Sequence, residues 1–332
     1  MKLLKFTRYS EWWEYKMVPL LAIAYASINV VGLKIEEAYQ ELIFSLLAII
    51  VGAVYVSVIN DITDIKEDQV AGKANRMAPL ASVYRIVIIS FCVLSGIVCG
   101  FLIYPNLLGV FFYAMAWISF SLYSLPPIRL KKRGVWGILC DAMGAHLFPT
   151  LFIVSNLAAL NKSPLIPWWY LAVGIWSITY GLRGILWHQF FDRNNDLKSG
   201  TETFASKKNP ENFQKQELCI FIIEVAFFTA IFIRTLSIWT AAALAIYIIL
   251  VFIRTFVFKY RLSLIITPAE APHQILMNDF YLVFFPLSLL LSSATAEPKG
   301  WIFVCCHLLL FPRKTIIVYN DLTLFLKRIV RQ

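Results

Sequence analysis

The chain has 332 residues, of which 59% are apolar and 15% are charged, and its mean hydropathy is +0.70. Soluble domains are less apolar and carry more charge, so this composition excludes an ordinary water-soluble protein. The net charge of +10 does not indicate nucleic-acid binding, because the cations flank apolar stretches where anionic lipid and membrane topology account for them. We therefore expect an all-α, polytopic membrane bundle with no nucleic-acid partner.

Nine apolar stretches follow one another along the chain, each long enough to cross about 30 Å of hydrocarbon as a helix. They lie at Lys16–Leu33, Glu41–Ile59, Tyr84–Tyr104, Leu107–Leu125, Val135–Leu160, Pro164–Trp187, Glu217–Ile233, Leu236–Phe258 and Asn278–Ser293. A tenth apolar run, Trp301–Phe311, is too short to span comfortably, and a re-entrant or interfacial position suits it.

Lysine and arginine residues gather on alternating connections between these stretches. The main groups are Lys2, Lys5 and Arg8; Lys66, Lys73 and Arg76; Arg129 to Arg133; and Lys198, Lys207 and Lys208. Because positively charged connections stay in the cytoplasm, the N-terminus and the ends of the second, fourth, sixth and eighth spans are predicted to be cytoplasmic. The N-terminal segment does not resemble a transit peptide, which favours a bacterial or archaeal plasma membrane.

The C-terminal segment is also basic. It contains Arg313, Lys314, Lys327, Arg328 and Arg331. A cytoplasmic position suits these cations, but nine spans that start in the cytoplasm would leave the tail on the other side. The two expectations agree only if Trp301–Phe311 crosses the membrane.

Two polar segments repeat at an offset of 128 residues. The first is NDITDIKEDQVAG and the second is HQFFDRNNDLKSG, so that Asn60, Asp61, Asp64, Asp68 and Gly72 align with His188, Gln189, Asp192, Asp196 and Gly200. Each segment ends an apolar stretch and enters a cytoplasmic connection. The repeat predicts one domain, residues 1–332, with two pseudo-repeated halves at about 16–134 and 135–260 around a central cavity, followed by C-terminal helices within 278–332.

The aspartate spacing indicates a metal site. On a helix, Asp61, Asp64 and Asp68 share one face, and so do Asp192 and Asp196. Stacked carboxylates repel, so a helix tolerates such a stripe most readily around a cation. Mg²⁺ prefers carboxylate oxygens and is commonly completed by substrate phosphates, so two facing stripes could hold a diphosphate through bridging metals. The alternative is that these are solvated charges balanced by nearby lysines and arginines.

A third segment, YSLPPIRLKKRG, begins at the end of the fourth apolar stretch. Pro126 and Pro127 end the helix there. Arg129, Lys131 and Lys132 then lie at the same membrane face as the aspartates, where they could neutralise a departing diphosphate. Positive-inside topology explains these cations equally well.

Together these segments resemble the UbiA superfamily of intramembrane prenyltransferases. NDITDIKED looks like the first aspartate motif of that family, YSLPPIRLK resembles its YSxPPxRxK loop, and DRNND matches its second, DxxxD motif. GKANRMAPLA is similar to the family's G-x-x-NRPLA segment, with Met77 and Ala78 standing between Arg76 and Pro79. The resemblance covers the first to the eighth span and implies nine helices around a central cavity, with Mg²⁺ and a prenyl diphosphate near the cytoplasmic face.

The resemblance also implies roles for individual residues. Metal ligands would be Asp61, Asp64, Asp68, Asp192 and Asp196, of which Asp61, Asp64 and Asp192 are the expected catalytic carboxylates. The diphosphate would be bound by Asn60, Lys73, Arg76, Tyr123, Arg129 and Lys131. His188 stands where many relatives carry a further acid, so it is predicted to act on the diphosphate or the acceptor; an ordinary interfacial histidine is the alternative.

Ionisable residues inside the apolar stretches are candidates for groups that act on the acceptor. Such residues are costly in lipid and usually face the bundle interior, and here they are Asp141, His146, Arg183 and Glu224. Asp141 and His146 follow the YSLPP segment, and we expect one of them to orient an acceptor hydroxyl or accept its proton. A buried polar pair satisfied within the bundle is the other interpretation.

The predicted function is Mg²⁺-dependent transfer of a prenyl group from a polyprenyl diphosphate to a small or lipid acceptor. Mg²⁺ draws electron density from the diphosphate, and a bound nucleophile captures the allylic cation. A membrane terpene cyclase, in which the same chain captures the cation, is the alternative. An ion-coupled transporter is the third reading, although transporter sites usually lie near the midplane rather than at one membrane face.

Overall fold

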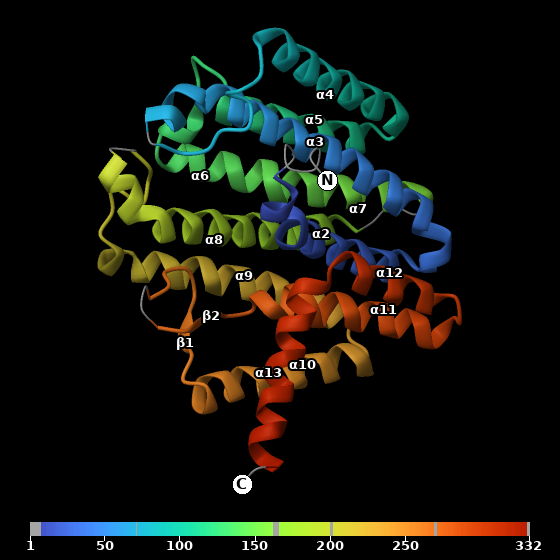
Figure 1. Cartoon of the computed structure of the whole chain (residues 1–332). Coiled ribbons are helices and arrows are strands. Elements are labelled where there is room, and N and C mark those ends of the chain that lie inside the picture. Colours follow the sequence, from blue (N-terminus) through green and yellow to red (C-terminus); the bar gives the residue numbers. More distant parts are fainter. Residues whose placement is uncertain (1–7, 71, 162–165, 200–201, 269–270, 331–332) are drawn as a thin grey trace.

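The structure is a computed structural model that describes residues 8–70, 72–161, 166–199, 202–268 and 271–330. Within this part of the chain nearly all regular structure is helical. The axes of most helices are roughly aligned, parallel or antiparallel, in a single bundle (Figure 1). The predicted all-α bundle is therefore confirmed. Lys2, Lys5, Pro164, Gly200 and Arg331, which the sequence patterns include, lie outside the described residues.

The chain up to the second aspartate motif forms long helices joined by short turns. These are α2 (Tyr9–Val31), α3 (Ile35–Val70), α4 (Ser82–Ile103), α5 (Leu107–Ser124), the η1 turn (Leu130–Lys132), α6 (Val135–Ala142), η2 (Met143–Leu147), α7 (Phe148–Leu160) and α8 (Pro167–Ser199). The η2 segment is a single π-helical turn that joins α6 and α7 into one continuous stretch. That stretch coincides with the predicted span Val135–Leu160.

The remaining chain is helical apart from one small sheet. It forms η3 (Pro210–Phe213), α9 (Gln214–Arg234), α10 (Ile238–Phe252), η4 (Ile253–Val257), η5 (Phe280–Phe284), α11 (Phe285–Ala296), α12 (Gly300–Leu310) and α13 (Pro312–Val330). Between η4 and η5, β1 (Arg261–Ser263) and β2 (His273–Ile275) pair in parallel, with Arg261 opposite His273. This sheet closes a long connection at the end of the bundle where α8 ends (Figure 1).

Among the described residues, six helices are long and apolar enough to cross a membrane, or seven if the bent pair of α12 and α13 is counted as one span. The six are α3, α4, α5, Val135–Leu160, Pro210–Arg234 and Ile238–Val257. The predicted stretches in α2, α8 and η5–α11 are helical, but Lys16 and Arg183 lower the hydropathy of the first two, and Phe280–Ala296 is short. The predicted count of nine spans is therefore not confirmed.

The core lies around α2, which packs against α7, α11 and η5. An almost unbroken run of α2 side chains from Met17 to Ile28 is buried, because this helix is enclosed by protein on most sides. A second concentration of buried rings, including Trp176, Phe228, Phe280 and Tyr281, joins α8 and α9 to η5. These contacts fix α3 and α8 relative to a common centre.

The two helices that carry the aspartate motifs are much longer than a bilayer requires. α3 has 36 residues and α8 has 33, so each is about 50 Å long against about 30 Å of hydrocarbon. Their last turns therefore extend beyond the apolar region at the same end of the molecule, the left side of Figure 1. Both aspartate motifs lie on helices rather than in loops, as their spacing predicts.

The first and last helices of the described chain, α2 and α13, begin close to each other. α12 runs beside α2 in the opposite direction: Lys34 pairs with Glu297 at one end, and Trp13 Nε1 donates to the Leu310 carbonyl (2.8 Å) at the other. Arg313 then contacts Glu14 and Ser10. The Trp301–Phe311 run thus brings the start of the basic tail close to the start of α2, and whether this run crosses the membrane stays a prediction.

A buried ion pair fixes α8 to α9. Arg183 Nε lies 2.7 Å from Glu224 Oε2, and the two side chains are 3% and 0% exposed. Arg183 also donates to the Leu276 carbonyl (3.0 Å), at the end of the connection that contains β1 and β2. Glu217 of α9 accepts the backbone N–H groups of Ile265 and Ile266 in the same connection. These contacts align the helix that carries the second aspartate motif.

Removing one partner of this pair would leave an uncompensated buried charge. We expect Arg183→Leu to destabilise the protein by about 3–5 kcal/mol, whereas Arg183→Leu combined with Glu224→Leu recovers much of that loss. Thermal unfolding of the purified protein in detergent measures both. A double variant as unstable as the single one would contradict charge compensation as the role of the pair.

Candidate active site

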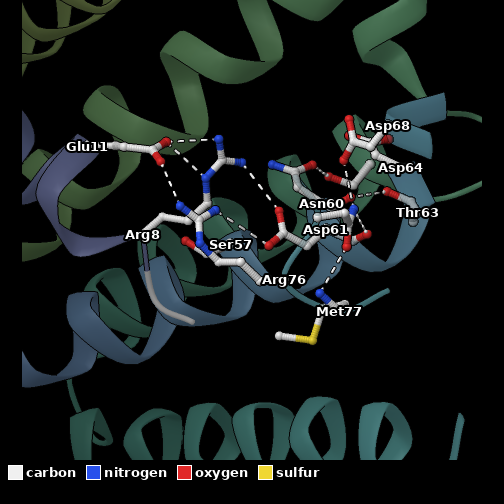
Figure 2. Close-up of polar contacts among 12 residues, drawn as sticks. Arg8, Glu11, Ser57, Asn60, Asp61, Thr63, Asp64, Asp68, Arg76 and Met77 are labelled. Carbon is white, nitrogen blue, oxygen red and sulfur yellow. Dashed lines mark hydrogen bonds and ion pairs between the residues drawn. The ribbon is translucent and has the colours of Figure 1, made fainter. Parts of the chain in front are cut away.

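The first aspartate motif occupies the last turns of α3. Asp61 is 4% exposed, whereas Asp64 and Asp68 are partly exposed (Figure 2). Asp61 and Asp68, seven residues apart, lie close enough for their charges to interact. Asp64 is instead paired with cations from the segment after α5. The helical spacing thus brings the three carboxylates to one region, but with different partners.

Two arginines from distant parts of the chain point toward Asp61. Arg8 Nη1 is 3.5 Å from Asp61 Oδ1, and Arg76 Nη1 is 3.8 Å from Asp61 Oδ2. Glu11 forms an ion pair with each arginine (Figure 2). Its carboxylate oxygens lie 2.9 Å from Arg8 and 3.2 Å from Arg76. Asp61 Oδ2 is buried and has no hydrogen-bond partner within the described residues. One carboxylate oxygen of Asp61 therefore remains able to take a further ligand.

Asn75 connects the first motif to the segment that follows it. Its Nδ2 donates to the Asp61 carbonyl and to Asp68 Oδ2, both at 2.7 Å. Its Oδ1 accepts the backbone N–H groups of Met77 (2.9 Å) and Ala78 (3.0 Å). A single amide thus fixes the Asp68 side chain and the turn that presents Arg76.

The YSLPP segment lies directly against the first motif. Arg129 Nη2 is 2.7 Å from Asp64 Oδ1, and Lys131 pairs with the same oxygen. Arg129 adopts a left-handed backbone conformation with φ of 41°, a strained conformation that surrounding contacts must hold. Asn60 accepts a short hydrogen bond from Ser124. Burial lowers the pKa of Lys131, against the opposing effect of the Asp64 carboxylate.

The second motif lies on the last turns of α8. His188 Nδ1 is 3.5 Å from Asp192 Oδ2, and both side chains are largely exposed. Asp196 is 7% exposed and accepts a hydrogen bond from Thr203 Oγ1 (3.1 Å). Arg193 donates to the Ala205 and Lys208 carbonyls, which holds the 203–208 connection against the helix.

Lys73 lies between the two motifs in the chain and within electrostatic reach of the second. It follows the first motif, and its charge interacts with that of Asp196 in the second. The two carboxylate groups thus border a common region at one end of the bundle, with cations between and around them. The structure brings together Asn60, Asp61, Asp64, Asp68, Lys73, Arg76, Arg129 and Lys131 on the α3 side, and His188, Asp192 and Asp196 on the α8 side.

An aromatic cavity continues from the first motif into the bundle. Its wall on α3 runs from Ala48 through Gly52 to Ser57, one turn before Asp61. Aromatic side chains form much of the rest: Trp12, Tyr55, Tyr113, Trp117, Phe120 and Phe152. Lys16 also lines this cavity. The cavity is therefore mostly apolar, with Lys16 and Ser57 as polar lining residues, and its α3 wall lies on the N-terminal side of the carboxylates.

Tyr123 begins the YSLPP segment, and Asp141 and His146 follow that segment on α6 and η2. Tyr123 is within electrostatic reach of both Asp64 and Asp141, so it links the first motif to α6. His146 is buried on η2 with its ring centroid 5.3 Å from that of Tyr180. A Cβ at Gly181 would lie 3.0 Å from the His146 ring, so glycine allows α8 to approach η2 closely. Asp141 is only partly buried, and no contact joins it to His146 among the described residues.

The donor set suits a hard cation. In the described part of the chain, no three histidine, cysteine, aspartate or glutamate side chains converge closely enough to hold a metal ion by themselves. Mg²⁺ commonly binds through one or two carboxylates and completes its shell with water and substrate phosphates. The unpartnered buried oxygen of Asp61 and the carboxylates of Asp64, Asp192 and Asp196 fit that mode of binding.

Four residues of this site did not follow from the sequence patterns. Arg8 and Glu11 belong to the N-terminal segment, where cations were attributed to topology alone. Asn75 was part of a recognised segment but was given no role, and Lys16 was taken as the start of a span. The position of Lys16 at the edge of an apolar stretch is the one sequence feature that indicates it, because an ionisable residue there usually faces the protein interior.

The fold and this site define an integral membrane protein with acidic helix ends, adjacent cations and an apolar cavity behind them. The chain belongs to the UbiA prenyltransferase family, whose model matches residues 17–269. No curated protein sequence is significantly similar to the chain.

Solved structures of a UbiA homolog from Archaeoglobus fulgidus have the same fold. The structure bound to GPP and Mg²⁺ has a TM-score of 0.61 and 17% identity, covering 92% of this chain and 100% of that chain. The structure bound to DMAPP and Mg²⁺ has a TM-score of 0.61 and 16% identity, covering 92% and 99%. A third structure of that homolog has a TM-score of 0.56 and 16% identity, covering 92% and 100%.

The contacts of Asn75 lead to a test of the site's construction. Asn75→Ala would leave the N–H groups of Met77 and Ala78 without acceptors, which costs about 1–3 kcal/mol locally. We expect faster amide hydrogen exchange at these residues, measured by mass spectrometry. Asn209→Ala, which removes an amide from a different turn at the same end, should leave them unchanged. Unaltered exchange in Asn75→Ala would contradict the bridging role.

Proposed function

We propose that the protein transfers a prenyl group from a prenyl diphosphate to a small acceptor inside the membrane. The observation that carries this proposal is that the α3 carboxylates, with Arg129 and Lys131 beside them, follow an aromatic cavity whose wall on the same helix ends at Ser57. A prenyl diphosphate has the matching shape: a polyanionic head and a long apolar tail. Membership of the UbiA prenyltransferase family supports the same reaction class.

The two aspartate motifs would hold Mg²⁺ and the diphosphate between them. Asp61, Asp64 and Asp68 would contribute from α3, and Asp192 and Asp196 from α8. When bound there, Mg²⁺ would withdraw electron density from the diphosphate and so weaken the allylic carbon–oxygen bond. The binding of GPP and Mg²⁺ by the Archaeoglobus fulgidus homolog supports this assignment.

Cations around the motif would bind the diphosphate directly. Arg129 and Lys131 now pair with Asp64, and Arg76 with Asp61. As the bond to the prenyl carbon breaks, these groups would stabilise the charge that develops on the leaving diphosphate. Lys73 and His188, at the border of the second motif, would contact its outer oxygens. Asn60 would position the phosphates from α3, and Tyr123 would do so from the end of α5.

The prenyl tail would occupy the aromatic cavity. Its wall on α3 extends from Ala48 to Ser57, about 14 Å of helix. Aromatic faces such as those of Trp117 and Phe120 can stabilise a cation developing near the diphosphate end. They would also keep water away from it until the acceptor reacts.

Asp141 is a better candidate than His146 for the group that acts on the acceptor. It is partly exposed, it adjoins Tyr123, and no ion pair engages its carboxylate in the described structure. It could accept a proton from an acceptor hydroxyl as the new bond forms. His146 is buried against Tyr180 and is better suited to shaping that pocket.

The site would face the cytoplasm. The basic connections after α3 and α5 and the basic tail lie at the same end of the bundle, and positively charged segments stay on the cytoplasmic side. A bacterial or archaeal plasma membrane remains our proposal for its location. The two halves, about residues 16–134 and 135–260, would act as one domain because each supplies one aspartate motif.

Product analysis tests the proposal. Purified protein, Mg²⁺ and prenyl diphosphates of several lengths are incubated with and without a metabolite extract, and the products are identified by mass spectrometry. We expect prenylated products only with extract, and at least a hundredfold less diphosphate release for Asp64→Asn or Asp192→Asn. Glu202→Gln, an exposed acid at the same end, should have no effect.

The other outcomes are equally informative. A hydrocarbon or terpene alcohol formed at full rate without extract would identify a terpene cyclase instead. Release of no diphosphate by the parent under any condition, with both aspartate variants indistinguishable from it, would contradict an enzymatic role.

The proposed role of Asp141 makes a separate prediction. Asp141→Asn should lower turnover about a hundredfold or more, the usual contribution of a general base, while the KM for the prenyl diphosphate stays the same. Steady-state kinetics with the identified acceptor measures both parameters. Unchanged turnover would exclude a base role for this residue, and a comparable loss in His146→Gln would shift the role to His146.

A further inference from the structure

The last helix, α13, lies across the bundle rather than along it. It is bent by 88° from α12 and runs across the direction of the other helices (Figure 1). It packs against η4, η5 and α12. α13 therefore forms a strap that crosses the start of α2 and the η4 and η5 segments, at the ends of α10 and α11.

Polar contacts hold this strap at the level where the spans begin. Glu14 of α2 accepts the first backbone N–H groups of α13, from Arg313 (2.8 Å) and Lys314 (3.1 Å). Buried Arg254, near the end of α10, pairs with Asp321 at 2.7 Å and with Asp279. These acids and bases therefore neutralise one another within the protein.

α13 has three different faces. Val318, which is 5% exposed, marks the face toward the protein. Ile316, Tyr319 and Leu326 share a second face and are 53%, 67% and 60% exposed. A third face, about a quarter-turn away, carries Arg313, Asn320 and Lys327 at seven-residue intervals, all exposed. Ile317 and Leu324, which are 46% and 53% exposed, border this stripe on its other side. A helix whose outer surface carries both apolar and basic side chains suits the boundary between hydrocarbon and water.

The exposed charge is almost entirely positive. Arg313, Lys327 and Arg328 are exposed, whereas the only acid of α13, Asp321, is paired with Arg254. Each such cation near an anionic bilayer surface is worth on the order of a fivefold gain in binding. The strap thus presents cations without exposed anions at the level of the membrane surface.

We propose that α13 is an interfacial helix that binds anionic lipid headgroups of the leaflet next to the aspartate motifs. Ile316, Tyr319 and Leu326 enter the boundary of the acyl chains, and Lys327 and Arg328 contact lipid phosphates. The spans beside the strap place lipid next to these side chains. The strap thereby fastens the ends of α10 and α11 to the membrane surface.

Hydrogen exchange of the full-length protein in lipid nanodiscs tests this assignment. The bilayer is either phosphatidylcholine alone or equal parts of phosphatidylcholine and phosphatidylglycerol. We expect the amides of α13 to exchange roughly tenfold more slowly in the mixed bilayer. Lys327→Gln with Arg328→Gln should abolish this difference. Arg234→Gln, which neutralises an exposed arginine at the end of α9, should retain it.

A second variant separates the apolar face from the charges. Tyr319→Ser with Leu326→Ser should speed exchange in both bilayers. Equal exchange of the parent α13 in the two bilayers would overturn the proposal without any variant, as would a difference that survives the loss of both cations. Slower exchange only at higher protein density would also overturn it, since a second copy would then be the occupant. Exchange in α3 and α8 serves as the check on folding.

Discussion

Three carboxylates on the last turns of α3 repel one another, and the surrounding segments are arranged so that this repulsion is offset. Arg8 comes from the start of the chain, Arg76 from the turn after α3, and Arg129 and Lys131 from the segment after α5. Asn75 and Glu11 then orient parts of this set. In the proposed reaction the same cations turn from carboxylate to phosphate oxygens, so the contacts that stabilise the free site also prepare it for its substrate.

The membrane determines where this chemistry can occur. A helix that crosses hydrocarbon cannot expose carboxylates within it at low cost, so the charged groups lie on turns of α3 and α8 that extend past the apolar region. The aromatic cavity begins one turn further in, at Ser57. The boundary between water and lipid thus coincides with the boundary between the head and the tail of the proposed substrate.

Sequence patterns predicted the helical bundle, both aspartate motifs and the YSLPP segment, because each depends on spacing within one helix or one turn. They could not predict that Arg8 approaches Asp61, since that contact joins residues 53 positions apart. The predicted count of nine spans stays unconfirmed, because polar residues such as Arg183 lower the hydropathy of helices that protein encloses. The strap formed by α13 depends on a bend after Phe311, which no periodic pattern indicates.

The central claim is that both aspartate motifs hold one metal–diphosphate group between them. The most direct measurement is the anomalous density of Mn²⁺ in crystals grown with an unreactive prenyl diphosphate analogue. Our account predicts metal density that contacts the α3 carboxylates and the α8 carboxylates, with the phosphates between them and the tail in the aromatic cavity. Metal bound to one motif alone, or phosphates held away from both, would contradict it.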